Sequence, residues 1–188
     1  MDFSTHPLQV IQDLRATLPA RGLRLEFARY SYIPQHAGPY PREVFTVLAS
    51  SVTPTWLRAT LRQQEPRQEL ALQSRLYVGS QTYFMGMIDF DGAPRDPRPQ
   101  LAKVLPPDYL EKLKLFSSGR SMHGYIPVAM NADDRRQYLG RLLLANFPDQ
   151  PQLVDSRWVG HRLQEGFEAL RWSCNTKQYK AYPSLYQP

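Results

Sequence analysis

Residues 83–92 form the stretch that most restricts how this chain can fold. A run of apolar residues leads into Asp89 and Asp91, which are separated by a single phenylalanine. Residues i and i+2 of a β-strand project to the same face, so the two carboxylates are expected side by side at the end of an otherwise apolar strand. Two negative charges this close repel each other, and a divalent cation with oxygen ligands is the usual compensation. The pattern favours a two-metal site for phosphoryl transfer, and the plainer alternative is a pair of acids that caps a turn.

The composition indicates a globular protein. The 188 residues, of which 42% are hydrophobic, fit one domain or two small lobes around a core. No apolar run approaches the roughly 20 residues that span a bilayer, and the first residues lack the basic and apolar segments of a signal peptide. Cys174 is the only cysteine, which excludes an internal disulfide and a cysteine-rich zinc site. We therefore expect a reduced, cytoplasmic protein with no membrane partner.

The charge balance favours an anionic partner. The formal net charge is +6, and arginine supplies most of the positive charge. Arginine holds phosphate oxygens with a planar fork, and a basic protein attracts nucleic acids and nucleotides. The alternative is a basic surface that serves only solubility.

Hydrophobic periodicity and the positions of proline and glycine divide the chain into helices and strands. The predicted helices are residues 6–18 with a hydroxyl cap at Ser4, a segment from Thr53-Pro54 to Pro66, residues 101–116 with a break at Pro106-Pro107, and residues 131–143 capped by Asn131. The predicted strands are residues 23–28, 44–48, one or two in 75–91 with a break near Gly79-Ser80, 121–130, 152–155 and 167–173, and the predicted loops are residues 34–41 and 92–99. The alternation indicates an α/β or α+β fold in which a central mixed or antiparallel sheet, flanked by helices, carries the site.

A second candidate motif starts at Ser118. Ser118 and Gly119 form a small-residue turn whose backbone N–H groups can approach an anion closely, and Arg120 adds a positive charge. Ser121 and His123 are two residues apart at the start of a predicted strand, so they share a face. This combination suits a triphosphate, with His123 expected across a cleft from the aspartates. The alternative for His123 is an ordinary half-buried histidine.

The third candidate motif is Val154-Asp155, another acid at the end of a short apolar segment. Asp155 is the candidate third metal ligand, and the alternative is a helix or turn cap, which is a common role of aspartate. Arg157 and His161 follow closely. They are candidate contacts to nucleotide or template, or else ordinary surface residues.

The order and spacing of these motifs resemble the catalytic core of the archaeo-eukaryotic primase superfamily, which includes primase-polymerases and the polymerase domain of bacterial end-joining ligases. The resemblance covers about residues 80–180. The matching segments are residues 87–91 for the first motif, 118–127 for the second, Val154-Asp155 for the third, and 170–177 for a downstream strand with an arginine and a lysine. The chain lacks the zinc-binding cysteine and histidine cluster that some members carry as an insertion.

The resemblance implies a template-dependent nucleotidyltransferase, a DNA primase or primase-polymerase that makes or extends primers on single-stranded DNA from NTP or dNTP. It implies a single domain over residues 1–188, with a small N-terminal αβ module in 1–75 and an RRM-like catalytic module in 76–188. It also implies two Mg²⁺ or Mn²⁺ ions. The implied catalytic and metal-binding residues are Asp89, Asp91 and Asp155. The implied contacts to the nucleotide phosphates are Ser118, Gly119, Arg120, Ser121 and His123, with Arg171 and Lys177 as further ones.

Two other functions fit parts of the sequence. A degenerate primase-like module would bind nucleic acid without turnover. A nucleotide-sugar transferase would use the Asp-x-Asp pair but leaves residues 118–123 unexplained. A replicative helicase or another replication protein is a further expected partner. The candidates for stacking on template bases are Trp158, Trp172, Tyr179 and Tyr182, with core packing favoured for both tryptophans.

Overall fold

The computed structural model of the protein describes residues 3–18, 21–31, 41–92, 95–179 and 181–187. Its helices are α1 Leu8–Thr17, α2 Pro54–Arg62, α3 Arg98–Leu101, α4 Pro107–Lys112, α5 Ala132–Leu144 and α6 Ser156–Glu165, with a 3₁₀ turn at Ala49–Ser51. Its strands are β1 Arg24–Ser31, β2 Arg42–Leu48, β3 Gln68–Val78, β4 Gln81–Asp89, β5 Lys114–Ser117, β6 Met122–Met130, β7 Ala169–Arg171 and β8 Ser184–Leu185. No helix in these ranges is long and apolar enough to cross a membrane.

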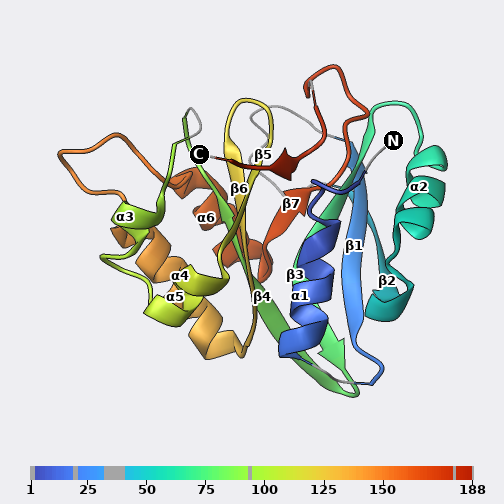
Figure 1. The fold of residues 1–188 in the computed structure, drawn as a ribbon, viewed down its shortest axis with the longest axis horizontal. Coiled ribbons are helices and arrows are strands. Elements are labelled where there is room, and N and C mark those ends of the chain that lie inside the picture. The colour runs from blue at the N-terminus through green and yellow to red at the C-terminus, as the bar shows by residue number, and fades with distance from the viewer. Residues whose placement is uncertain (1–2, 19–20, 32–40, 93–94, 180, 188) are drawn as a thin grey trace.

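One sheet runs through the middle of the molecule (Figure 1). Its strand order is β2-β1-β3-β4-β6-β5-β8, and β7 pairs with β3 beside this path. All pairings between the strands of the described ranges are antiparallel. The predicted fold class, a central sheet flanked by helices, is therefore confirmed. The sheet continues through residue 75, the expected boundary between two modules, because that residue lies within β3.

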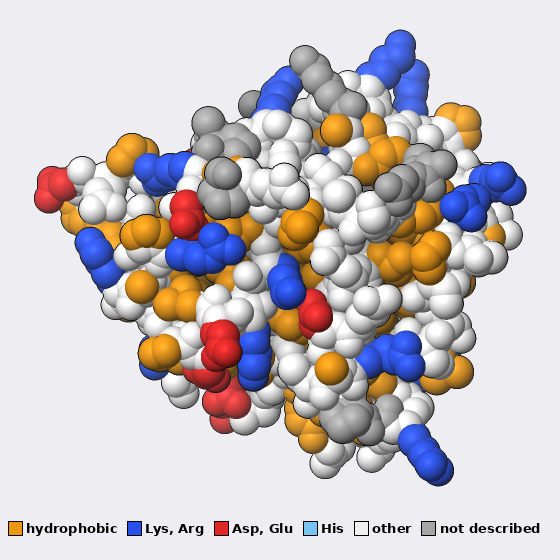
Figure 2. Space-filling view, in the orientation of Figure 1, with side chains coloured by type: hydrophobic (Ala, Val, Ile, Leu, Met, Phe, Trp, Pro, Cys, Tyr) orange, Lys and Arg blue, Asp and Glu red, His pale blue; other side chains and the backbone are white. Residues whose placement is uncertain are grey.

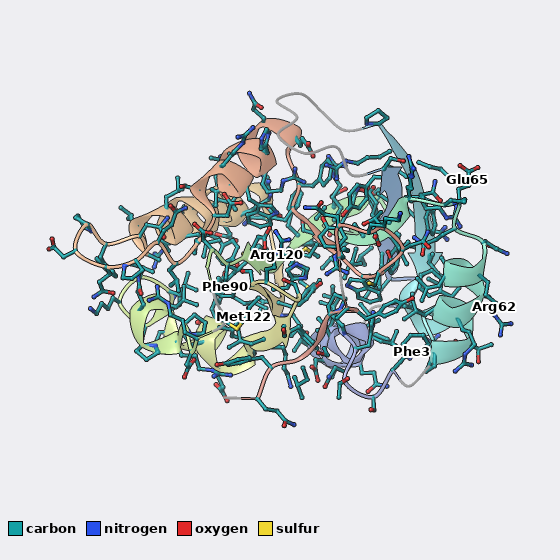
Figure 3. All side chains as sticks on the ribbon, turned by 90° about the horizontal axis from the view of Figure 1, so that it is seen from above. Phe3, Arg62, Glu65, Phe90, Arg120 and Met122 are labelled. Atoms are coloured by element: carbon teal, nitrogen blue, oxygen red, sulfur yellow. The ribbon has the colours of Figure 1, made fainter. Side chains whose placement is uncertain are left out.

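The strand that ends at Asp89 separates two hydrophobic cores. Met85 and Met87 of β4 belong to a core that α1 covers, whereas Ile88 and the following Phe90 belong to a core that α5 covers. This alternation is the period of two that a strand buried on both faces requires. Viewed from above, α1 and α6 lie on opposite sides of the sheet (Figure 3).

Several local signals in the sequence are confirmed as predicted. The side chain of Thr53 caps α2 by accepting a hydrogen bond from the backbone N–H of Trp56, at 3.2 Å. Asn131 caps α5 by accepting from the N–H groups of Asp133 and Asp134, at 2.8 and 2.9 Å. The break near Gly79 is the turn between β3 and β4. The predicted loop at residues 34–41 lies outside the described residues, apart from Pro41.

Three local predictions are corrected. No side chain caps α1 in the position expected for Ser4, because the helix begins after Pro7 and the ring Nδ1 of buried His6 accepts from the N–H of Leu8. The predicted helix 101–116 is helical only in α4, because α3 ends at Leu101 and β5, which pairs with β6, begins at Lys114. The strand predicted at residues 152–155 is a single bridge between Val154 and Phe90.

The surface charge on the face of Figure 1 is dispersed. In Figure 2, Lys and Arg side chains project around the margins of this face, and several stand beside acidic side chains or hydrophobic patches. The excess of positive charge in the sequence therefore forms no single basic patch on this face.

Gly86 marks the closest approach between β4 and β6. A Cβ atom there would lie 2.9 Å from the Cβ of Ile126, which is its partner in the register. Alanine normally stabilises a strand relative to glycine, but here the steric overlap with Ile126 should outweigh that gain. We expect Gly86→Ala to lower the free energy of unfolding by about 1–3 kcal/mol, measured by urea denaturation.

Gly140 provides the matched control for that substitution. It lies within α5, and a Cβ atom there meets nothing within 4 Å. Gly140→Ala is expected to raise the free energy of unfolding by up to about 1 kcal/mol. A stabilising effect of Gly86→Ala would contradict the tight packing of β4 on β6.

Candidate active site

A cleft of about 810 Å³ lies where the end of β4 meets the starts of β6 and α6. Its volume suits a small-molecule ligand such as a nucleotide. Every residue predicted to bind metal or nucleotide phosphate lines this cleft, apart from Lys177, and so do the possible contacts Arg157 and His161. Lys177 is exposed on a turn instead. The sequence motifs thus come together in one place, while the role of each residue there stays a prediction.

Backbone hydrogen bonds bring the acidic motifs together. The N–H of Asp155 donates to the carbonyl of Asp89 at 3.0 Å, and the N–H of Asp91 donates to the carbonyl of Leu153 at 2.9 Å. Phe90 forms an antiparallel bridge with Val154 between these two bonds. The segment after β4 therefore runs directly beside the segment before α6. This geometry places Asp155 on the same side of the sheet as Asp89, as the metal-site hypothesis requires.

The three carboxylates differ in how many hydrogen bonds they accept from backbone N–H groups. Oδ1 of Asp155 accepts from the N–H groups of Arg157 and Trp158, at 2.9 and 3.0 Å, so Asp155 is the N-cap of α6. Oδ1 of Asp91 accepts from the N–H of Gly92 at 2.8 Å. Asp155 and Asp91 therefore do act as caps, the alternative role considered for them, and each does so with only one carboxylate oxygen. The carboxylate of Asp89 takes part in no hydrogen bond with the described residues, and Nε2 of His123 lies 3.9 Å from its Oδ1.

Negative charge outweighs positive charge around the carboxylate of Asp89, as the pKa of this group indicates. Burial raises the pKa of its carboxyl, and the nearby charges of Asp155 and Asp91 raise it further. The positive charges of Arg162 and Arg171 offset only part of this, and the pKa of Asp89 reaches about 7. A divalent cation would relieve this repulsion, because it favours the ionised form of each carboxylate.

The donor set fits Mg²⁺ or Mn²⁺ in chemistry, since both prefer carboxylate oxygen. As the side chains stand, however, no three histidine, cysteine, aspartate or glutamate residues of the described ranges are grouped so as to hold a metal ion. Full ligation therefore requires Asp91 and Asp155 to turn an oxygen toward Asp89. Both carboxylates retain an oxygen that is not bound to the backbone amides.

His123 lies beside Asp89, not across the cleft from it. The two residues are partners in the register of β4 and β6, and Nε2 of His123 is 3.9 Å from Oδ1 of Asp89. The expected separation was wrong because cross-strand partners are neighbours on one face of a sheet. Burial, and secondarily the charge of Arg171, lowers the pKa of His123 to about 3. The ring is therefore neutral, and its buried Nδ1 has no hydrogen-bond partner among the described residues.

The turn after β5 is tied to the acidic segment. The N–H of Ser118 donates to the carbonyl of Ser121 at 2.9 Å, and Gly119 has a φ of 111° that favours glycine. The hydroxyl of Ser121 donates to the carbonyl of Phe90, between the two aspartates. Arg120 is exposed, and it lines the cleft together with Phe90. Ser121 therefore holds the turn against the acidic segment, and residues 118–121 of the turn line the cleft.

Comparison with known proteins agrees with this arrangement. A family model described as Archaeo-eukaryotic primase 1D-like matches residues 49–184, which is most of the chain. The chain belongs to this family. A search among curated proteins found no match.

Two solved structures share the fold of this archaeo-eukaryotic primase-like chain. The structure of primase RepB′ has a TM-score of 0.52 at 13% identity, and the match covers 95% of this chain and 56% of that one. The structure of the catalytic domain of primase RepB′ in complex with initiator DNA has a TM-score of 0.52 at 14% identity, with 97% and 85% covered. This chain thus spans little more than half of the first structure. The resemblance to the superfamily is confirmed, and the two structures support the fold.

In this primase-like chain, Arg171 binds the backbone. Its guanidinium donates to the carbonyls of Ser118 at 2.7 Å and Ala181 at 3.1 Å, and also to that of Ser173. It lies 3.9 Å from the ring centroid of Tyr179 and is 4% exposed. Arg171 therefore positions the turn and the C-terminal segment, and its contact to a phosphate stays a prediction.

Several residues that line this cleft belong to none of the sequence motifs. Tyr30, Arg42 and Arg162 line it, although no motif pointed to them. Arg162 lies on α6, a helix that was not predicted, and the Asp155 cap and Gly166 at its C-terminus are the signals that could have found it.

The aromatic candidates have different positions. Trp172 is fully buried in the core that α1 covers, as favoured. Trp158 packs against both cores and also lines the cleft. Tyr179 lines the cleft, and Tyr182 is not among the described residues that do so.

Proposed function

We propose that this protein is a template-dependent nucleotidyltransferase of the primase type, which makes or extends primers on single-stranded DNA from NTP or dNTP. The observation that carries the proposal is the joining of Asp89, Asp91 and Asp155 by backbone hydrogen bonds in the cleft that also contains the Ser118–Ser121 turn. An acidic centre next to an anion-binding turn is what transfer of a nucleotidyl group requires. The family supports a nucleotidyltransferase over a nucleotide-sugar transferase.

The residues of the cleft would have separate roles in nucleotidyl transfer. The backbone N–H groups around Gly119, the side chain of Arg120 and the neutral ring of His123 would hold the triphosphate, with Nδ1 or Nε2 of His123 as a donor. When bound by the aspartates, Mg²⁺ or Mn²⁺ supplies activation of the primer 3′-hydroxyl and stabilises the leaving pyrophosphate. Ser121 and Arg171 would hold the turn in place. Single-stranded template is the expected partner, and a replicative helicase or other replication protein is a further one.

The test is primer synthesis on single-stranded DNA with Mg²⁺ or Mn²⁺ and mixed nucleotides. Products should form with the wild-type protein, and omission of the metal or addition of EDTA should abolish them. A separate assay with a preformed primer distinguishes extension from initiation. Metal-independent products, or products that persist after replacement of the aspartates, would contradict the proposal.

A nucleic-acid-binding module without turnover is the second candidate. It is favoured by the use of Asp155 and Asp91 as caps and by the absence of a ready group of three metal-binding side chains among the described residues. This module would bind single-stranded DNA with a strong salt dependence. It would form no product with either metal, and DNA affinity would not change on addition of metal and nucleotide.

A further inference from the structure

Glu69 is a buried carboxylate that belongs to none of the sequence motifs. It is the second residue of β3 and is fully buried. Its side chain projects from the same face of the strand as that of Ala71, which lines the cleft. Glu69 itself is not among the described residues that line it. A buried carboxylate needs other groups to satisfy it, so its partners indicate what it holds in place.

Both oxygens of Glu69 bind the segment that follows β7. Oε1 accepts from the backbone N–H groups of Asn175 and Thr176, at 2.9 and 2.7 Å, and Oε2 accepts from the hydroxyl of Ser173. Three donors from four consecutive residues thus converge on one carboxylate. Hydrogen bonds to an ionised group are stronger than those between neutral groups, so Glu69 fixes the path of this segment.

A second anchor holds the same segment from its exposed side. The side-chain amide of Asn175 donates to the carbonyls of Glu65 and Gln68, at 2.8 and 3.0 Å. Asn175 is exposed, whereas Glu69 is fully buried. The two anchors can therefore be removed separately, and loss of the second one does not disturb the core.

The anchored segment continues into a wall of the cleft. Gln178 and Tyr179 line the cleft, and the N–H of Tyr179 donates to the carbonyl of Thr176 at 3.3 Å, so a turn joins the anchor to the wall. The ring of Tyr179 contacts the guanidinium of Arg171, which also donates to the carbonyl of Ser118. A continuous chain of contacts therefore runs from the anchor to the turn after β5.

We propose that Glu69 is a positioning residue for the nucleotide site, and that it acts through residues 173–179, here called the wall segment. Glu69 fixes this segment, so that Tyr179 and Arg171 are already in place before a nucleotide binds. A loosened wall segment would have to become ordered on binding, and that cost lowers affinity. The identity of the ligand rests on the proposed function, whereas the contacts that hold the wall segment do not.

Binding of ATP with Mg²⁺, measured without primer or template, tests this role. Glu69→Gln keeps the size of the side chain and removes the charge that strengthens its three hydrogen bonds. We expect ATP affinity to fall by about fivefold, because neutral hydrogen bonds are weaker than those to a charged group. Backbone hydrogen exchange, measured by NMR, should become faster at the amides of Tyr179 and Ser118.

Glu26→Gln is the matched control for a general loss of stability. Glu26 is a buried glutamate of the same sheet, and it accepts from Arg75 and Tyr77, which are not among the described residues that line the cleft. The control should leave ATP affinity and exchange at Tyr179 unchanged, whatever it does to the free energy of unfolding. Equal ATP affinities in Glu69→Gln and Glu26→Gln would overturn the positioning role.

Asn175→Ala separates positioning from a direct effect of charge, because it loosens the wall segment and keeps the carboxylate of Glu69. It should lower ATP affinity by about two- to threefold and speed exchange at Tyr179. Wild-type affinity in Asn175→Ala, with a loss in Glu69→Gln, would assign the effect to charge and overturn the positioning role. If the wild type binds no ATP but exchange at Tyr179 responds to both substitutions, the positioning of the wall segment stands and the proposed function is contradicted.

Discussion

Replacement of Asp89 by asparagine is expected to abolish primer synthesis and to stabilise the metal-free protein above pH 7. Activity should fall by more than about 100-fold, because loss of an outer partner of a metal ligand already costs 10- to 100-fold. Stability should rise because the substitution removes a charge that burial and Asp155 destabilise. An inactive variant that is more stable than the wild type is typical of a residue kept for function.

The sign of the pH dependence follows from the raised pKa. The carboxyl of Asp89 has a pKa of about 7 in the folded protein against an ordinary value of 3.8. Between these values the folded state keeps a proton that the unfolded state has released, so this contribution to stability is lost as pH rises through that window. The asparagine variant does not titrate. Its advantage should therefore grow from pH 4 to pH 8 and reach on the order of 1–3 kcal/mol, after a reduction because the Asp89 side chain is 30% exposed.

Urea denaturation in EDTA at pH 5 and pH 8 measures this difference. Asp96→Asn is the matched control, because Asp96 is 41% exposed and pairs with Arg98 on the surface. The control should keep both its activity and its pH profile. Activity of the Asp89 variant within tenfold of the wild type, or a stability gain that does not grow with pH, would contradict the assignment.

The first two motifs of this site could be predicted from the sequence, because the signals for them are local. The apolar run before Asp89 and the two-residue spacing to Asp91 predict a strand end, and β4 does end at Asp89. The Ser-Gly turn before His123 is likewise a local pattern, and it precedes β6. Such patterns depend only on the period of a strand and on the conformational freedom of glycine.

The rest depends on partners that are distant in the sequence. β5 is a strand because it pairs with β6, although its four residues also continue a helical pattern. His123 lies beside Asp89 because β4 and β6 are neighbours, an arrangement that no local signal specifies. Arg42 and Arg162 are far apart in the sequence and come together at Glu165 in the fold, so neither stood out in the sequence. Local propensity gives way to tertiary pairing at each of these positions.

Arg171 holds three backbone carbonyls in addition to lining the cleft, and its replacement should have the largest effect on stability. Arg171→Ala removes the donor to the buried carbonyl of Ser173 and breaks two partly buried hydrogen bonds, to the carbonyls of Ser118 and Ala181. We expect a loss of about 3–5 kcal/mol in the free energy of unfolding, since hydrogen bonds to a charged group are strong and orphaned buried groups are costly. Arg171→Lys keeps the charge but not the planar fork, so its loss should be smaller.

Arg120→Gln is the matched control, since Arg120 belongs to the same turn but is exposed. Its effect on the free energy of unfolding should stay within about 0.5 kcal/mol. Hydrogen exchange at the amide of Ser118, which donates to Ser121, should become faster in Arg171→Lys than in the control. A loss below about 1 kcal/mol for Arg171→Ala would contradict the positioning role.

Kinetics separate the two possible roles of Arg171. If Arg171 only positions the turn, Arg171→Lys should weaken nucleotide binding through a less ordered turn, and KM for the nucleotide should rise together with the exchange rate at Ser118. If Arg171 contacted phosphate directly, lysine would preserve much of the binding as a point charge, and the exchange rate would not change. The hydrogen bonds of Arg171 to the carbonyls of Ser118 and Ala181 favour the first outcome.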